Sequence, residues 1–143
     1  MHRVERSALM PYSAEQMFHV VDDVASYAAF LPWCESSVVE SQQEESMTAT
    51  LTITGAGMRQ SFTTRNVRDF PVSIEMSLLE GPFSSLQGRW KFTQLGEDGC
   101  KILMNLEFDF DNRLMNKTLG KVFESAADRL VDAFCHRAEA LYG

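Results

Sequence analysis

The side chains best suited to metal binding or nucleophilic chemistry are few in this sequence and stand far apart. They are three histidines and three cysteines: His2, His19, His136, Cys34, Cys100 and Cys135. Neither His19 nor His136 has a second histidine or cysteine three or four residues on, and no two cysteines have the spacing of a zinc or redox motif. We therefore expect three free thiols in a reducing compartment, and no bound metal.

Two further arrangements could support catalysis, and neither is complete. Cys34 follows Trp33, but a cysteine nucleophile needs a nearby base, and no Cys/His spacing supplies one. Glu107 and Asp109 lie two residues apart, so they share one strand face, and the alternation of that segment turns this face outward. Because the sequence contains no catalytic constellation, we expect a protein that binds a molecule and is not an enzyme.

Composition and length narrow the class of protein. A chain of 143 residues has the size of one domain, and we expect a single domain over 1–143. The net charge of −7 argues against general binding to DNA or to an anionic membrane. No apolar run approaches the ~20 residues of a membrane-spanning helix, and no secretion or transit signal is apparent at the N-terminus. We therefore expect a cytoplasmic protein.

The first forty residues predict one strand and two short helices. Residues 2–10 alternate as a strand does, and Pro11 ends them. Ser13 then opens a helix, because Ser13 and Gln16 have the spacing of a capping box. A second short helix follows through Tyr27 and Phe30, and Pro32 ends it.

From Trp33 to about Asp111 the apolar pattern has a period of two. Its clearest strand is 47–53, and turn residues at 55–57, 69–71, 81–82 and 96–99 separate it from later strands. Strands joined by such short turns are antiparallel neighbours. Counting the first strand, we expect about seven of them.

After Asn112 the period returns to 3.6 and predicts one helix of ~28 residues, about 42 Å long. Its apolar stripe needs a cover, and the sheet is the only large apolar surface available. Gly120 lies early in this helix and indicates a bend or a close approach of another segment. The predicted fold is α+β, with a curved antiparallel sheet around a long C-terminal helix.

A strongly curved sheet cannot touch a straight helix everywhere, so the pattern also predicts an apolar cavity between them. Small residues leave room there and flexible methionines can line it. The expected lining residues are Met47, Leu51, Phe62, Met76, Trp90, Met104, Phe108, Val122 and Phe123. The alternative is that these residues simply fill a dry core.

Five cations take the outward position of their strands and could form a basic face on this acidic protein. They are Arg59, Arg65, Arg89, Lys91 and Lys101. The alternative is an ordinary solvated sheet face, in which Glu75 and Glu107 dilute the positive charge.

Three segments of the chain resemble a known family. The segment from Tyr27 to Cys34, which ends in Phe30-Leu31-Pro32-Trp33-Cys34, resembles a signature of the START-like polyketide cyclase/coenzyme Q-binding family. Gly81-Pro82-Phe83, with the strand after it, resembles the second signature, and 131–138 resembles the C-terminal helix of the family. The resemblance covers essentially the whole chain and implies the helix-grip fold, also called START/Bet v1-like.

The resemblance implies two functions from different classes. One is a carrier that holds ubiquinone or a related polyprenyl lipid in the cavity, supports respiration and requires no cofactor. The alternative is the ribosome association toxin branch of the family, whose members bind the large ribosomal subunit and block subunit joining; a small antitoxin protein would then be a further partner. A third reading is an adaptor with a filled core and no ligand.

Overall fold

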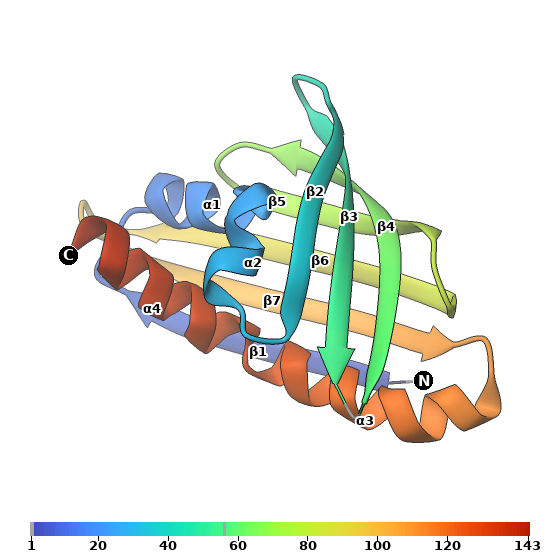
Figure 1. Cartoon of the computed structure of the whole chain (residues 1–143). Helices are drawn as coiled ribbons and strands as arrows, with labels where there is room; N and C mark the ends of the chain where they lie inside the picture. The colour runs from blue at the N-terminus through green and yellow to red at the C-terminus, as the bar shows by residue number, and fades with distance from the viewer. Residues whose placement is uncertain (1, 56) are drawn as a thin grey trace.

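The computed structural model describes residues 2–55 and 57–143, which form a seven-stranded antiparallel sheet with helices against one face (Figure 1). The strands are β1 (His2–Met10), β2 (Cys34–Gln42), β3 (Ser46–Gly55), β4 (Met58–Asp69), β5 (Ser73–Glu80), β6 (Phe83–Leu95) and β7 (Gly99–Phe110). Their order is β1-β7-β6-β5-β4-β3-β2, so β1 and β7 are neighbours although they are not consecutive in sequence. The predicted α+β helix-grip fold is confirmed.

The segment after β1 is helical, as predicted. Helix α1 (Ala14–Asp22) begins with the expected capping box: the Gln16 N–H donates to Ser13 Oγ at 3.1 Å, and the Ser13 N–H donates to Gln16 Oε1 at 2.9 Å. A 3₁₀ turn, η1 (Val24–Ser26), leads into α2 (Tyr27–Phe30). These elements cover one end of the sheet (Figure 1).

The strand boundaries agree with the predicted turns, with small differences. The turn at 55–57 lies between β3 and β4, although Ala56 is outside the described residues. Val72 shares the alternation of Ile74 and Met76, which predicts the inner face of a strand, but β5 starts one residue later and Val72 is 44% exposed. Its N–H donates to the Asp69 carbonyl in the preceding turn, so Val72 belongs to that turn.

The C-terminal helix differs from the prediction of one straight helix. It is divided into α3 (Arg113–Asp128) and α4 (Leu130–Tyr142), with a break at Arg129. At the break the Arg129 N–H donates to the Ala126 carbonyl, three residues back, so the last turn of α3 is tightened. The two halves pack on different partners: α3 lies along β1 and β7, and α4 packs on α1 as well as β1. Gly120 marks a close approach by His2 and not the bend.

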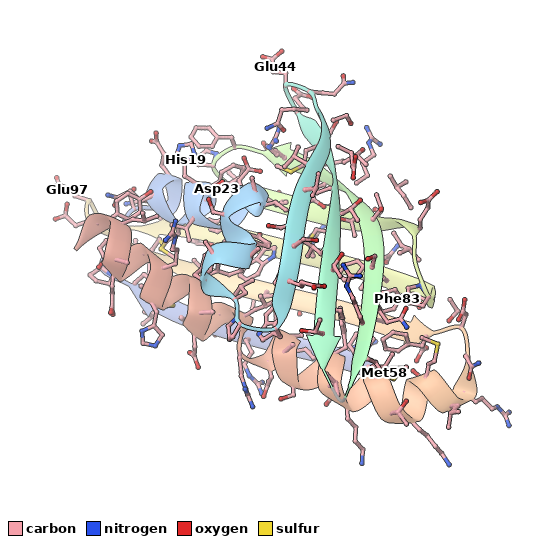
Figure 2. The ribbon with its side chains drawn as sticks, in the orientation of Figure 1. His19, Asp23, Glu44, Met58, Phe83 and Glu97 are labelled. Atoms are coloured by element: carbon pink, nitrogen blue, oxygen red, sulfur yellow. The ribbon has the colours of Figure 1, made fainter. Side chains whose placement is uncertain are left out.

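The core is formed by the inner face of the sheet and by the helices above it. In β7 the even-numbered residues from Cys100 to Phe110 are all buried, which is the alternation that one covered face requires. Phe83 of β6, labelled in Figure 2, contacts Phe123 of α3 with ring centroids 5.3 Å apart, so aromatic side chains join sheet and helix. None of the helices in the described part of the chain has the length and apolar character that crossing a bilayer requires.

Candidate functional site

An apolar cavity of about 70 Å³ lies between the sheet and the helices. Residues of η1, α2, the loop before β2, β3 to β7 and both halves of the C-terminal helix line it: Val24, Tyr27, Trp33, Ala49, Leu51, Ile53, Phe62, Thr64, Asn66, Met76, Leu86, Trp90, Leu106, Phe123, Ala126, Ala127, Leu130 and Phe134. One water needs roughly 10–15 Å³, so the cavity can hold a few, and it is smaller than the roughly 300–1,000 Å³ of drug-sized sites.

The opening of the cavity lies beside the break in the C-terminal helix. Of the lining residues, Trp33 before β2, Leu51 and Ile53 of β3, Met76 of β5, and Ala126 and Leu130 at the break keep partial exposure, and five of these six lie on the side of the break. A straight helix would continue through this region, whereas the break at Arg129 lets the two halves turn away from each other. The bend therefore helps to form the mouth.

Two groups of aromatic rings form opposite walls. Phe62 and Phe123 meet with centroids 5.8 Å apart at the α3 end. Phe134 of α4 lies 5.2 Å from both Trp90 and Tyr27. Such edge-to-face and tilted ring pairs add about 0.5–1.5 kcal/mol each beyond the area they bury, so they stabilise these parts of the wall.

The structure brings five of the nine predicted lining residues to the cavity: Leu51, Phe62, Met76, Trp90 and Phe123. Met47, Met104 and Phe108 are at most 2% exposed and are packed in the core. Val122 packs against β3, because its Cγ1 lies over Gly55. Whether any of these residues contacts a ligand stays a prediction.

The predicted lining did not include the polar part of the cavity wall. Thr64 and Asn66 line it, although they are only 7% and 5% exposed. They follow Phe62 at intervals of two on β4, so strand alternation alone would have placed them inward. The Thr64 hydroxyl donates a hydrogen bond to Asn66 Oδ1 at 2.9 Å.

The first motif segment, Pro32-Trp33-Cys34, forms part of the cavity wall. Trp33 lines the cavity, and its carbonyl accepts a hydrogen bond from the Thr54 N–H at 2.9 Å. Cys34 is buried and its thiol lies 3.3 Å from the Ser36 carbonyl, to which it donates. This segment therefore fixes the edge of the mouth to β3.

The second motif segment, Gly81-Pro82-Phe83, supports the wall from behind. Gly81 has a φ of 151°, and a Cβ there would lie 2.7 Å from the Cβ of Phe62, so only glycine fits without strain. The Pro82 carbonyl accepts from the Asp111 N–H at 3.0 Å, and Phe83 stacks on Phe110. The segment thus holds Phe62 in place.

The three thiols are suited to packing and not to nucleophilic attack. Burial raises the pKa of the Cys34 and Cys100 thiols. Burial, then the charges of Asp132 and Glu139, raises the pKa of Cys135 to about 11. The thiolate is the reactive form, so all three are held in the less reactive state at neutral pH. No group of three metal-binding side chains gathers anywhere in 2–55 or 57–143.

The predicted basic face on the outer side of the sheet is interrupted by carboxylates, and two of its five cations are paired with them. Arg59 pairs with Glu35, and Arg89 pairs with Glu75 directly across from it on β5. Arg65, Lys91 and Lys101 are exposed, and no carboxylate of the described residues is within ion-pair distance of them. The alternative reading, a mixed and solvated face, describes the geometry better.

A second group of cations, which the strand pattern does not indicate, lies on α3. Arg113, Lys117 and Lys121 are spaced four apart, so they form one stripe along the helix, and all three are exposed. Within the described chain, no carboxylate comes within 4.0 Å of any of them. Leu114, 69% exposed, lies beside them. We call these four residues the α3 stripe.

A curved antiparallel sheet closed by a long helix over an apolar cavity defines a START-like protein. The family model described as polyketide cyclase/dehydrase and lipid transport matches residues 10–135, and the chain belongs to this family. The Zhui aromatase/cyclase from Streptomyces sp. R1128 has the same fold, with a TM-score of 0.85 at 20% identity over 96% of this chain and 93% of that one.

Two curated relatives have names that bear on function. The Ribosome association toxin RatA of Pseudomonas aeruginosa is 49% identical over 140 residues, which cover 98% of this chain and 97% of the relative. The mitochondrial Coenzyme Q-binding protein COQ10 of Drosophila melanogaster is 25% identical over 133 residues, which cover 90% of this chain and 55% of that protein.

Proposed function

We propose that this protein associates with the ribosome and restrains translation, by binding the large subunit and hindering subunit joining. The observation that carries the proposal is the 49% identity to a ribosome association toxin over nearly the full length of both chains. The coenzyme Q-binding relative is more distant, and this chain matches about half of its length. These findings favour the ribosome-binding function over the ubiquinone-carrier function.

The α3 stripe is the surface best suited to ribosomal phosphates. An acidic protein with a net charge of −7 is repelled by RNA overall, so contact must occur where positive charge is local and not neutralised. Arg113, Lys117 and Lys121 meet that condition together on one face of a helix. On the sheet, Arg59 and Arg89 are already paired with carboxylates, and the unpaired Arg65, Lys91 and Lys101 lie on three different strands.

Co-sedimentation with purified large subunits, repeated over a range of salt concentrations, tests this proposal. The variant Arg113→Gln/Lys117→Gln/Lys121→Gln should bind more weakly. Its slope of log affinity against log salt should be smaller by about 2–3, because each lost phosphate contact removes roughly 0.7–0.9. The matched control is Arg65→Gln/Lys91→Gln/Lys101→Gln, which removes the same charge from the sheet face and should bind nearly as the wild type does.

The outcomes separate the function from the surface. If the wild-type protein does not sediment with large subunits at low salt, the proposed function is wrong. If it does, but the two triple variants lose affinity equally, the α3 stripe is not the contact surface and only the total charge matters.

A second candidate function is supported by the cavity itself. It is apolar and opens beside the helix break, and no activated nucleophile or paired acids stand in its wall, so it is suited to holding a hydrophobic molecule without transforming it. Its volume of about 70 Å³ leaves no room for a polyprenyl chain, which would have to pass out through the mouth. Mass spectrometry of organic extracts of the gently purified protein tests this function. A ligand-free extract with no thermal shift by soluble quinones would exclude it, since a bound ligand raises the Tm.

A further inference from the structure

The cavity contains a polar pair whose hydrogen bonds are not all made within the protein. Thr64 and Asn66 are both more than nine-tenths buried, in a wall that is otherwise almost entirely apolar. A buried amide N–H that lacks an acceptor lowers the stability of the folded state. The pair therefore calls for a functional explanation.

The hydrogen bond between the two side chains orients the amide. Because the Thr64 hydroxyl donates to Asn66 Oδ1, that oxygen is occupied and Nδ2 keeps both of its N–H groups. No acceptor in the described chain bonds to Nδ2, and this atom is not fully enclosed, so it retains open surface. Since Asn66 faces the cavity, that open surface is the cavity.

Among the other polar groups of the wall, Trp90 leaves a further N–H donor unused in the described chain and Tyr27 does not. The indole N–H of Trp90 also has no acceptor among the residues described, although Trp90 is 2% exposed. The Tyr27 hydroxyl, in contrast, donates its proton away from the cavity to the Val21 carbonyl. The unused donors of the wall are thus N–H groups. A ligand can bond to them only through an acceptor atom that carries a lone pair.

We propose that the cavity binds the flat head of an apolar molecule through a carbonyl-type oxygen that accepts from Asn66 Nδ2. This inference rests on the second candidate function, ligand binding in the cavity, and names the chemistry that it requires. A carbonyl oxygen has two lone pairs and brings no donor of its own, so it matches the unused N–H groups. An apolar molecule without an acceptor would displace water from Nδ2 and leave it unpaired.

Met76 and Gly88 supply the room for a ring. The two residues are opposite each other on β5 and β6, and the Met76 methyl lies where a Cβ of residue 88 would come within 2.5 Å. Methionine has three rotatable bonds, so Met76 can turn aside and open the space over Gly88. The space that Met76 would vacate adjoins Asn66, because the two residues are paired across β4 and β5, and a longer apolar tail would leave through the mouth at Leu51 and Leu130.

Two small probes of nearly the same shape test the inference, acetophenone with a carbonyl and ethylbenzene without one. Their dissociation constants are measured by following the Trp90 indole and Asn66 side-chain amide signals in nitrogen-15 NMR. The wild-type protein should bind acetophenone about five- to tenfold more tightly, the worth of one net hydrogen bond. In Asn66→Leu the preference should vanish or reverse, while ethylbenzene still binds. Ser61→Ala, on the outer face of the same strand, is the control and should keep the wild-type preference.

Each result decides a separate question. If the wild type binds both probes equally, or if Asn66→Leu keeps the preference for acetophenone, the proposed role of Asn66 is wrong. Ligand binding in the cavity would still be supported. If neither probe binds at millimolar concentration, both the role of Asn66 and ligand binding in the cavity are wrong. If Asn66→Leu is unfolded by circular dichroism, Asn66→Asp takes its place. This variant keeps the shape but replaces the N–H donors by an acceptor, and it should disfavour acetophenone relative to ethylbenzene.

Discussion

At the residue scale, the buried hydroxyl of Tyr27 makes a testable link between the cavity wall and alkaline stability. Burial, and then the charges of Asp22 and Asp23, raise the pKa of Tyr27 above its ordinary value of about 10. The folded protein therefore holds this proton more tightly than the unfolded chain. The stabilisation is fully present below pH ~10 and is lost as the pH rises above it, because the unfolded state then gives up the proton first.

Tyr27→Phe should remove that part of the pH dependence. At pH 7 the variant should lose about 1 kcal/mol of unfolding free energy, since the hydrogen bond to the Val21 carbonyl is gone. Between pH 10 and 11 its stability should decline less steeply than that of the wild type. Urea unfolding at pH 7, 9, 10 and 11 measures both effects, and parallel declines in the two proteins would show that Tyr27 is not the group responsible.

Residue placement was predictable from the sequence only in part. Strand alternation correctly turned Phe62 and Trp90 inward, but it could not distinguish residues that fill the core from those that border a void, as Met104 and Phe108 show. That distinction depends on how far the helix stands from each strand. Pairing of exposed charges is equally hidden, because Arg59 meets Glu35 through a register that no local pattern reveals.

At the scale of elements, Gly120 of α3 is a position where the usual helix rule should fail. Replacing glycine by alanine inside a helix normally stabilises by about 1 kcal/mol. Here the added Cβ would lie 2.7 Å from Nε2 of His2. That ring cannot easily yield, because it is stacked on Phe108 and its two nitrogens bond Asn116 Oδ1 at 3.1 Å and Glu124 Oε2 at 3.0 Å.

We therefore expect Gly120→Ala to destabilise the protein by about 1–3 kcal/mol. In a His2→Ala background the same substitution should become stabilising, by up to about 1 kcal/mol, because the obstructing ring is gone. Thermal or urea unfolding of the four proteins of this double-mutant cycle measures the coupling. Additive effects would mean that His2 and Gly120 do not meet in solution.

The break between α3 and α4 is the element that the sequence did not predict. Helix breaks usually coincide with proline or paired glycines, and 126–130 contains neither. The apolar period also continues through Arg129, so the pattern alone indicates one helix. The break arises from tertiary packing, since α3 follows β1 and β7 while α4 turns to meet α1.

At the scale of the whole molecule, Arg68 connects parts of the chain that no strand ladder joins. Its side chain is 10% exposed, and its Nε donates to Asp22 Oδ1 of α1 at 2.7 Å. Its Nη1 donates to the Gln43 carbonyl at 3.0 Å, in the loop of the β2–β3 hairpin whose tip carries Glu44 (Figure 2). Arg68 thus ties the protruding hairpin to the first helix.

Arg68→Ala should cost about 1.5–3 kcal/mol, because it removes a charge-assisted hydrogen bond to the partly buried Asp22 carboxylate. It should also speed amide hydrogen exchange in the hairpin loop at 43–45. The matched control is Arg65→Ala on the same strand, where the side chain is exposed and the effect should stay within about 0.5 kcal/mol. Equal stability of the two variants would show that Arg68 contributes no more than an ordinary surface charge.

The order of the sheet has a consequence for how the chain folds. Among the described residues, five of its six ladders join strands that are consecutive in sequence, and these can form outward from their turns. The β1–β7 ladder instead joins distant parts of the chain, since Met10 pairs with Cys100. Closing that loop costs roughly 2–3 kcal/mol more entropy than closing a hairpin, by the logarithmic growth of loop entropy with length. Docking of β1 is therefore expected to be the late step of folding. A circular permutant that starts at β2 would carry β1, α1, η1 and α2 behind α4, which shortens the separation of β1 from β7 and should make their pairing an earlier step.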